Sequence, residues 1–266
     1  MSPLRRRWPE LGAGAIAVAM LVHGPIAQLA HYHEFADTRT LLGIPHALDV
    51  LSNAGFVAVG LWGLAAPWSA RRDPAFAPSW PGYLVFGLAL VATAFGSGWY
   101  HLAPDDARLV WDRLPIALAC AGLLAAVHGD THGDRHPWTI VTVLVALACA
   151  SVWWWSFTGR HGTGDLRPYL YLQAIPLLLI PGWQAVHGAP RSRRLAFGAA
   201  ILLYAAAKVF ELADHAVFDA TGWVSGHTIK HLLATAASAA IIGEAAGRSR
   251  ARRAPPTPRA PAPAAS

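Results

Sequence analysis

Two histidines near the end of the sequence have a spacing that suits metal binding. His227 and His231 stand four residues apart. On an α-helix this spacing projects both imidazoles from one face, one turn apart, where they can share a metal ion. An isolated pair with this spacing also fits two interfacial histidines that contact lipid headgroups or backbone carbonyls. The metal hypothesis therefore needs further ligands at the same place.

His101 is the candidate for a third ligand. Ser97 precedes it by about one helical turn, and Asp112 follows it in the run Trp111-Asp-Arg-Leu-Pro115. Three protein ligands leave the fourth position of a zinc ion open, as a catalytic site requires. A hydroxyl and a carboxylate beside such an ion can transfer protons or stabilise charge. Asp112 also fits the N-cap of a helix, where its carboxylate would accept backbone N–H groups.

These motifs need elements that bring them together, and the composition predicts a membrane protein. The chain has 266 residues, of which 55% are hydrophobic and 14% are charged. Stretches of about 20 apolar residues are long enough to cross the hydrocarbon core of a bilayer as helices. Hydropathy and turn residues place eight such spans. They lie near residues 11–30, 47–66, 82–101, 114–128, 138–157, 168–187, 196–215 and 228–246.

The two ends of the chain differ from this apolar region. Residues 1–10 are expected as a cytoplasmic N-terminal segment, and residues 11–247 as the transmembrane bundle. Arg5–Arg7 before the first span resemble the start of a signal peptide, but the apolar run is long and no clear cleavage motif follows. An uncleaved first helix is therefore expected. Residues 248–266 are rich in Arg, Pro and Ala and are expected to be disordered.

The basic residues indicate the orientation of the spans. With the N-terminus inside, cytoplasmic segments hold 14 of the 21 basic residues and the outer loops hold 5, while Lys208 and Lys230 lie in or at helices. Because cytoplasmic loops are enriched in Lys and Arg, both termini are expected in the cytoplasm of a multi-pass protein, in a bacterial inner membrane or another cell membrane. This orientation brings His101, Asp112 and His227 to the outer face. Their shared depth favours one metal site over separate interfacial histidines.

Other polar residues inside the spans are candidates for a supporting role. Ionisable residues are costly in a membrane and are therefore functional candidates by default. Lys208 and Glu211 can neutralise each other, or they can act with Asp214 to orient the metal ligands. Asp49 and Asn53 share a face of the second span, where they can form hydrogen bonds between helices or serve the site.

Two other groups of histidines are expected in solvated loops. One group lies on the cytoplasmic side and is interrupted by glycines: His128, His132 and His136. The other lies in the first outer loop with two acidic residues: His31, His33, Glu34 and Asp37. The second group is close enough to the predicted site to cover or charge its mouth.

The remaining features point to no further site. The basic residues are almost all Arg in short loops and the tail, so nucleic-acid binding is not expected. Cys120 and Cys149 lie in apolar stretches, where cysteine behaves as a small hydrophobic residue. Trp153, Trp154 and Trp155 fit an aromatic belt at the membrane surface.

Four motifs in order make the chain similar to a known family. They are Asp49-Val-Leu-Ser-Asn53, Gly96-Ser97-x3-His101, Trp111-Asp112-Arg-Leu-Pro115 and Ser225-Gly-His227-x3-His231. In this order they resemble the alkaline ceramidase family and its wider superfamily of seven-helix membrane hydrolases, which includes the progestin and adiponectin receptors. The resemblance covers residues 49–231. It implies an all-α transmembrane helix bundle with a seven-helix core, here the second to eighth spans, so that the first helix is an extra N-terminal helix.

The resemblance also implies the chemistry of the site. It implies Zn2+ held by His101, His227 and His231, with Ser97 and Asp112 beside it. Such an ion lowers the pKa of its water from roughly 16 to about 7 and polarises a carbonyl. Asp112 is expected to move the proton from water to the leaving amine, and Ser97 to stabilise the oxyanion by roughly 3 kcal/mol. The expected reaction cleaves the amide of ceramide or another N-acyl lipid into a fatty acid and a long-chain amine.

Calcium is a second ion to consider. Animal alkaline ceramidases carry an acidic calcium-binding segment before the first core helix. Between His31 and His46 no matching pattern is clear, and Asp37 is the one candidate ligand. Ca2+ is therefore possible without a clear motif.

Three other functions fit parts of the pattern. A receptor-like binding protein of the same superfamily would hold a structural zinc and tolerate the loss of Asp112 or Ser97. A serine protease of the rhomboid type would use Ser97, flanked by Gly96 and Gly98, and would be indifferent to chelators. A haem-binding electron carrier would show a Soret band and would leave the serine and the aspartate unexplained.

Overall fold

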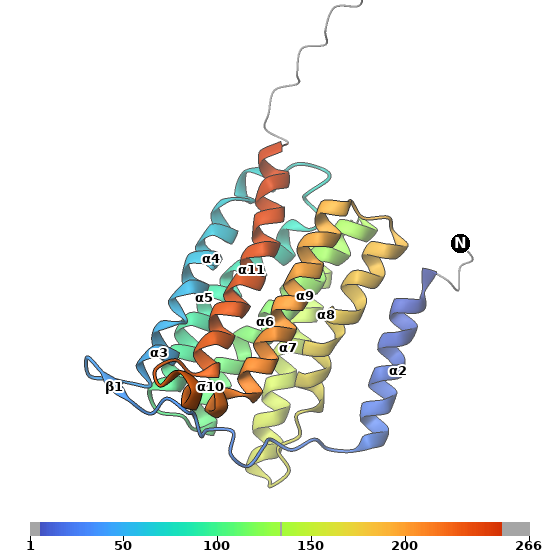
Figure 1. Cartoon of the computed structure of the whole chain (residues 1–266). Helices are drawn as coiled ribbons and strands as arrows, with labels where there is room; N and C mark the ends of the chain where they lie inside the picture. Colours follow the sequence, from blue (N-terminus) through green and yellow to red (C-terminus); the bar gives the residue numbers. More distant parts are fainter. Residues whose placement is uncertain (1–5, 134, 252–266) are drawn as a thin grey trace, which may run out of the picture.

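The computed structural model describes residues 6–133 and 135–251, which fold as a bundle of α-helices (Figure 1). The long helices are α2 (Trp8–His23), α5 (Trp80–Leu102), α6 (Asp106–His132), α7 (Pro137–Arg160), α8 (Arg167–Val186), α9 (Arg191–Leu212) and α11 (Gly226–Ala251). Shorter elements are α3 (Ala47–Leu51), α4 (Ala54–Ala65), α10 (Asp214–Thr221), the 3-10 helix η1 (Trp68–Ala70) and a hairpin of β1 (Thr40–Leu41) and β2 (Ile44–Pro45). The predicted helical bundle is confirmed.

Within the described residues, six helical segments are long and apolar enough to cross a membrane. They are Ala47–Ala70, Trp80–Leu102, Asp106–His132, Pro137–Arg160, Arg167–Val186 and Arg191–Leu212. These segments support a membrane protein. The apolar helix α2 has 16 residues and is shorter, and α11, with 26 residues, is not among the six. The eight spans and the seven-helix core with one extra helix therefore remain predictions.

The first two predicted spans differ from the helices that form. The span expected at 11–30 ends at His23, because Gly24 has a φ of 88° and Pro25 cannot continue a helix. The span expected at 47–66 is divided into α3 and α4. The break between these two helices places polar side chains of α3 toward the start of α11.

The fourth span is longer than the expected 114–128, because α6 begins at Asp106. Asp105 caps this helix and accepts a backbone N–H of the first turn at 2.7 Å. The N-cap role considered for Asp112 is therefore wrong, since Asp112 lies in the second turn. Arg113 is also a residue of α6, although the sequence places it among the five basic residues of the outer loops. A hydropathy window misses this start because residues 106–113 include four charged residues, which lower the mean hydropathy.

The last helix continues past residue 247, where the bundle is expected to end. In this part of α11, Arg248 binds Asp130 of α6 at 2.8 Å and Glu244 at 3.0 Å. Asp130 is 1% exposed in its side chain and Glu244 is 7% exposed. The last turns of α11 are thus fixed by buried ion pairs. Residues 252–266, where the sequence predicts a disordered tail, lie outside the described residues.

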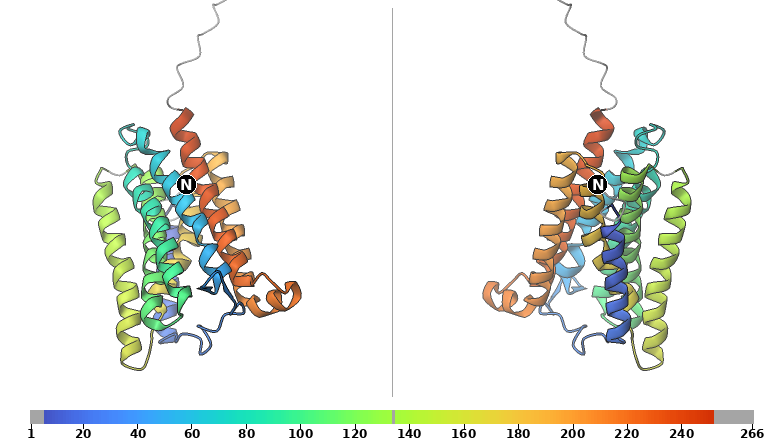
Figure 2. Two further views of the ribbon diagram at one scale, coloured as in Figure 1. Left: turned by 90° about the vertical axis from the view of Figure 1, so that its left-hand side faces the viewer. Right: turned by 90° about the vertical axis from the view of Figure 1, so that its right-hand side faces the viewer.

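The helices alternate in direction, so residues distant in sequence collect at each end. Helix α5 packs on α4 and α6, α11 packs on α4 and α9, and α2 packs against α8 (Figure 2). Helices α5, α7 and α9 end, and α6, α8 and α11 begin, at the end drawn lowest in Figure 1, which we name the site end. The segment from residue 24 to residue 46 crosses this end between α2 and α3 (Figures 1 and 2).

Candidate metal centre

Three histidine side chains from two helices meet at the site end. His101 lies in the last turn of α5, and His227 and His231 lie in the first two turns of α11. Each offers a nitrogen, and these nitrogens lie within 4.8 Å of one another. The ring centroid of His101 is 4.7 Å from that of His227 and 5.1 Å from that of His231. All three residues are buried. The three histidines singled out in the sequence thus come together as a group that could hold a metal ion.

The surroundings of the imidazole nitrogens fit a metal. The Ser52 hydroxyl donates to the backbone oxygen of Asp49 at 3.1 Å and lies 2.8 Å from His231 Nδ1. Because its proton goes to Asp49, the hydroxyl accepts the Nδ1 proton of His231, which leaves Nε2 for a metal. His101 Nδ1 is buried and finds no hydrogen-bond partner in the described part of the chain. Three neutral imidazoles are ligands that zinc accepts.

Asp49 holds the start of α11 against α3. Ser225 accepts the backbone N–H of Thr228 at 2.9 Å and donates its hydroxyl proton to Asp49 Oδ1 at 2.8 Å. The Thr228 hydroxyl also donates to Asp49 Oδ1, at 2.6 Å. Asn53 Nδ2 donates to the backbone oxygen of Asp49 at 2.7 Å. The predicted hydrogen bonds between helices are therefore present for Asp49, directly beside His227, whereas Asn53 donates its side-chain hydrogen bonds to Asp49 and Val50 of its own segment.

Asp214 anchors the backbone on both sides of the cluster. Its Oδ1 accepts the N–H of His227 at 2.7 Å, and its Oδ2 accepts the N–H of Ala36 at 2.9 Å. Helix α11 can start this close because residue 226 is a glycine: a Cβ there would overlap the backbone oxygen of Phe210. Asp214 therefore positions His227 through its backbone and not through its ring.

Ser97 and Asp112 lie side by side because α5 and α6 touch at this level. A Cβ on Gly96 would overlap the backbone oxygen of Trp111, so only glycine allows this approach. The Ser97 hydroxyl is a neighbour of the Asp112 carboxylate. The oxygen of the Ser97 hydroxyl is buried and forms no hydrogen bond with any residue that the structure describes. The turn that carries Ser97 leads to His101 on the same face of α5.

Glu211 binds two lysines next to the histidines. Its carboxylate lies 2.6 Å from Lys208 Nζ and 2.8 Å from Lys230 Nζ. The pairing of Lys208 with Glu211 agrees with the sequence interpretation, which gave no role to Lys230. Yet Lys230 Nζ is 3.3 Å from His227 Nε2. The sequence feature that could have pointed to Lys230 is its position between His227 and His231.

Phe35 covers the cluster from the segment that crosses the site end. Its ring centroid lies 4.7 Å from that of His101 and 4.6 Å from that of His227. Phe35 is 7% exposed. No motif or periodicity singles out this residue, because its position depends on the path of a loop. The cover separates the histidines from the solvent on that side.

Comparison with protein-family models and with curated proteins identifies no relative of this chain. The sequence matches no protein-family model, and it matches no curated protein. The resemblance to alkaline ceramidases therefore rests on the four motifs. Six residues of these motifs lie at the site end: Asp49, Ser97, His101, Asp112, His227 and His231.

Asp37 gives no support to a calcium ion. Arg39 donates to Asp37 Oδ1 from Nε at 2.8 Å and to Oδ2 from Nη2 at 2.9 Å. His46 Nδ1 donates to the backbone oxygen of Asp37 at 2.7 Å. Burial alone would raise the pKa of Asp37, but the hydrogen bonds from Arg39 outweigh it and hold the pKa below its usual value. The carboxylate is thus neutralised by a guanidinium within its own loop.

Two other interpretations need correction. His128 and His132 do not lie in a loop: they belong to α6, with rings stacked 4.1 Å apart. The belt at the end of α7 includes Trp153 and Trp154, which are 56% and 38% exposed, but Trp155 is only 4% exposed. Trp155 faces the interior of the bundle and contacts Arg113.

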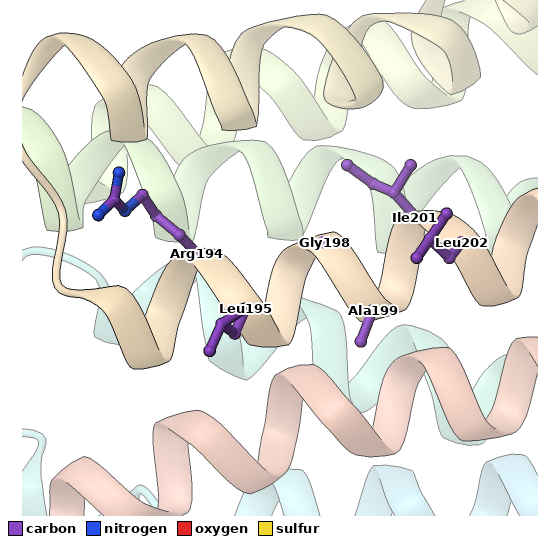
Figure 3. A pocket seen from close by; sticks show the side chains of 6 residues that line it. All are labelled: Arg194, Leu195, Gly198, Ala199, Ile201 and Leu202. Carbon is purple, nitrogen blue, oxygen red and sulfur yellow. The ribbon is translucent and has the colours of Figure 1, made fainter.

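A shallow hollow on α9 lies away from the histidines (Figure 3). It is lined by Arg194, Leu195, Gly198, Ala199, Ile201 and Leu202. These residues belong to the first half of α9, whereas the histidine cluster lies beyond the other end of that helix. Its lining is almost entirely aliphatic, and it offers no group for catalysis.

Proposed function

We propose that the protein is a zinc-dependent membrane amidase, similar to the alkaline ceramidases, that hydrolyses the amide of ceramide or another N-acyl lipid to a fatty acid and a long-chain amine. The observation that carries the proposal is the buried cluster of His101, His227 and His231, next to Ser97 and Asp112. Three neutral nitrogen ligands fit zinc and leave one coordination position open.

The residues around the cluster have separate roles in this proposal. His101, His227 and His231 would hold the zinc ion, which when bound would acidify a water and polarise a carbonyl. Asp112 takes a proton from the attacking water and delivers it to the leaving nitrogen as the C–N bond breaks. Ser97, whose hydroxyl lacks a hydrogen-bond partner among the described residues, donates to the carbonyl oxygen as that oxygen gains negative charge. Phe35 shields the rings from bulk water.

The location of the cluster suits a lipid substrate. Because it lies at one end of apolar helices, it sits at the depth where the amide of a lipid joins a buried chain to an exposed headgroup. The uneven distribution of Arg residues favours the outer face for this end and the cytoplasm for both termini. With Phe35 covering the loop side, the substrate enters laterally from the bilayer.

Asp112→Asn is the variant that tests the proposal. It should retain zinc but lose at least about 100-fold in the hydrolysis of a fluorescent ceramide, since general acid–base catalysis contributes about 10²- to 10⁴-fold. Ser97→Ala should lose about 10²- to 10³-fold, as for an oxyanion donor. Asp105→Asn is the matched control: it changes a carboxylate at the same helix end, and Asn is as good an N-cap as Asp.

The main competing function is a receptor-like protein of the same superfamily with a structural zinc. It has the same ligand set, so zinc content does not separate the two. A wild-type protein that binds zinc but cleaves no N-acyl lipid supports the receptor. Full hydrolytic activity in Asp112→Asn contradicts the proposed role of that carboxylate.

A further inference from the structure

The guanidinium of Arg113 is buried inside the bundle without a counter-ion. Arg113 is 2% exposed and follows Asp112 in α6. Its Nε and Nη1 atoms are buried and have no hydrogen-bond partner, and no carboxylate in the described part of the chain forms an ion pair with it. Buried charges in membrane proteins are costly and are usually paired. The protein itself therefore leaves an anion-binding position beside its proposed catalytic carboxylate.

Three aromatic rings hold this guanidinium in place. Its Cζ atom lies 4.0 Å from the ring centroid of Trp155 in α7, 5.4 Å from that of Tyr169 in α8 and 5.0 Å from that of Tyr32 in the segment that crosses the site end. Aromatic rings contact the faces of a guanidinium and leave the N–H groups at its edges available. Such a group is oriented for an anionic oxygen.

Arg113 faces the same interior as the histidine cluster. Tyr32, which contacts Arg113, is followed by His33, whose Nδ1 lies 2.9 Å from the Tyr100 hydroxyl. The ring centroid of Tyr100 lies 5.0 Å from that of His101. Asp112 and Arg113 are consecutive residues of α6, so their side chains leave the same turn of the helix about 100° apart, toward adjacent sectors of the bundle. An acid group bound by Arg113 therefore lies in the sector next to the one that holds Asp112.

Lys208 and Lys230 do not offer an equivalent position. Both ammonium groups bind Glu211, at 2.6 and 2.8 Å. Among the basic residues around the site, Arg113 is the buried one whose N–H groups lack acceptors within the described ranges. We propose that Arg113 binds a carboxylate of the substrate, so that the preferred substrate is an N-acyl amphiphile with an acid next to its amide, as in an N-acyl amino acid, and not neutral ceramide. This inference rests on the proposed amidase function.

The test compares two substrates that differ in one group. N-lauroylglycine carries a carboxylate where N-lauroylethanolamine carries a hydroxymethyl group. The wild type should hydrolyse N-lauroylglycine with the higher kcat/KM. Arg113→Met should lower kcat/KM for N-lauroylglycine by about 10- to 100-fold, as expected for the loss of hydrogen bonds to a charged group. The same variant should change kcat/KM for N-lauroylethanolamine by less than about threefold. Arg108→Met is the matched control, because it removes a half-buried arginine that pairs with Asp105 in the first turn of the same helix, and it should preserve the preference.

A binding measurement keeps this inference separate from the proposed function. Laurate should quench the fluorescence of the metal-free wild type more strongly than lauryl alcohol does, and the difference should vanish in Arg113→Met and in Trp155→Phe. If laurate binds in this way but neither amide is cleaved, the amidase proposal fails and the anion site stands. If both amides are cleaved without preference and laurate binds no better than the alcohol, the inference is overturned and the amidase stands.

Arg113→Lys keeps the inference testable if Arg113→Met does not fold. Lysine retains the positive charge but lacks the planar set of N–H groups. It should therefore retain part of the preference for N-lauroylglycine. A wild type that shows no preference for the acid contradicts the inference whatever the variants do.

Discussion

At the scale of single residues, the orientation of the histidine rings depends on hydroxyl and backbone groups around them. Ser52 fixes the proton of His231 on Nδ1, and Asp214 fixes the backbone of His227. Groups that orient a metal ligand in this way stabilise the metal as well as the ligand. We therefore expect Ser52 to raise the affinity of the histidine cluster for a metal, although its hydroxyl contacts only His231 Nδ1 in the cluster.

Ser52→Ala should weaken zinc binding by about 10- to 100-fold, because His231 loses the acceptor that holds its tautomer and ring orientation. The measurement is competition for zinc with a chromophoric chelator. Ser238→Ala serves as control, since Ser238 lies on the same helix as His231 but bonds only to the backbone oxygen of Ala234. Equal zinc affinity in Ser52→Ala and the wild type contradicts the role of Ser52.

The sequence predicts the ligands better than their surroundings. His227 and His231 share a helix face by spacing alone, and alternating spans bring His101 to the same end. Phe35 and Lys230 escape prediction because their roles depend on where a loop crosses and on which rotamer reaches the ring. Such contacts have no periodicity in the sequence.

At the scale of helices, the contact between α5 and α6 sets the geometry of Ser97 and Asp112. Gly96 permits the contact, because any side chain there meets the backbone of the neighbouring helix. Gly98, two residues later, has open space around the position of a Cβ. The two glycines therefore differ in function although they stand in the same motif.

Gly96→Ala should destabilise the protein by about 1–3 kcal/mol, as overpacked positions do, and should lower amidase activity by moving Ser97 away from Asp112. Gly98→Ala should leave activity unchanged and be neutral or stabilising by up to about 1 kcal/mol, because alanine favours helix over glycine. Thermal unfolding in detergent and an amidase assay measure both effects. Similar behaviour of the two variants would show that the helix contact is not what positions the serine.

The boundaries of the helices were the less predictable part of the fold. Apolar length predicts that helices form, but it misplaces ends where charged residues lie inside the bundle. The start of α6 shows this, since Arg113 is buried among aromatic rings that a hydropathy average does not detect. The division of α3 from α4 at the site end is a tertiary feature of the same kind.

At the scale of the whole molecule, the bundle has two chemically different ends. One end holds the histidine cluster and its cover, and the other holds the buried ion pairs of Asp130 with Arg248. Helix α2 begins and α11 ends at the second end (Figure 1). If this end faces the cytoplasm, as the Arg distribution favours, the histidine cluster lies at the outer leaflet.

A reporter fused to the C-terminus tests this orientation. Green fluorescent protein at that position should fluoresce, and alkaline phosphatase should stay inactive, because both would remain in the cytoplasm. Fusions within the loop between α7 and α8 should give the opposite result. An active phosphatase at the C-terminus would place the histidine cluster on the cytoplasmic side.

The most direct test of a catalytic three-histidine centre combines metal analysis with an amidase assay on the wild type and on His227→Ala. The wild type should carry about one zinc per chain and cleave an N-acyl lipid in a chelator-sensitive reaction, since zinc with three protein ligands is the catalytic form. His227→Ala should lose both the metal and the activity, whereas His161→Ala, which changes an exposed histidine beyond α7, should keep both. A wild-type protein that hydrolyses the lipid without zinc, or that contains no zinc when purified without chelators, contradicts the account.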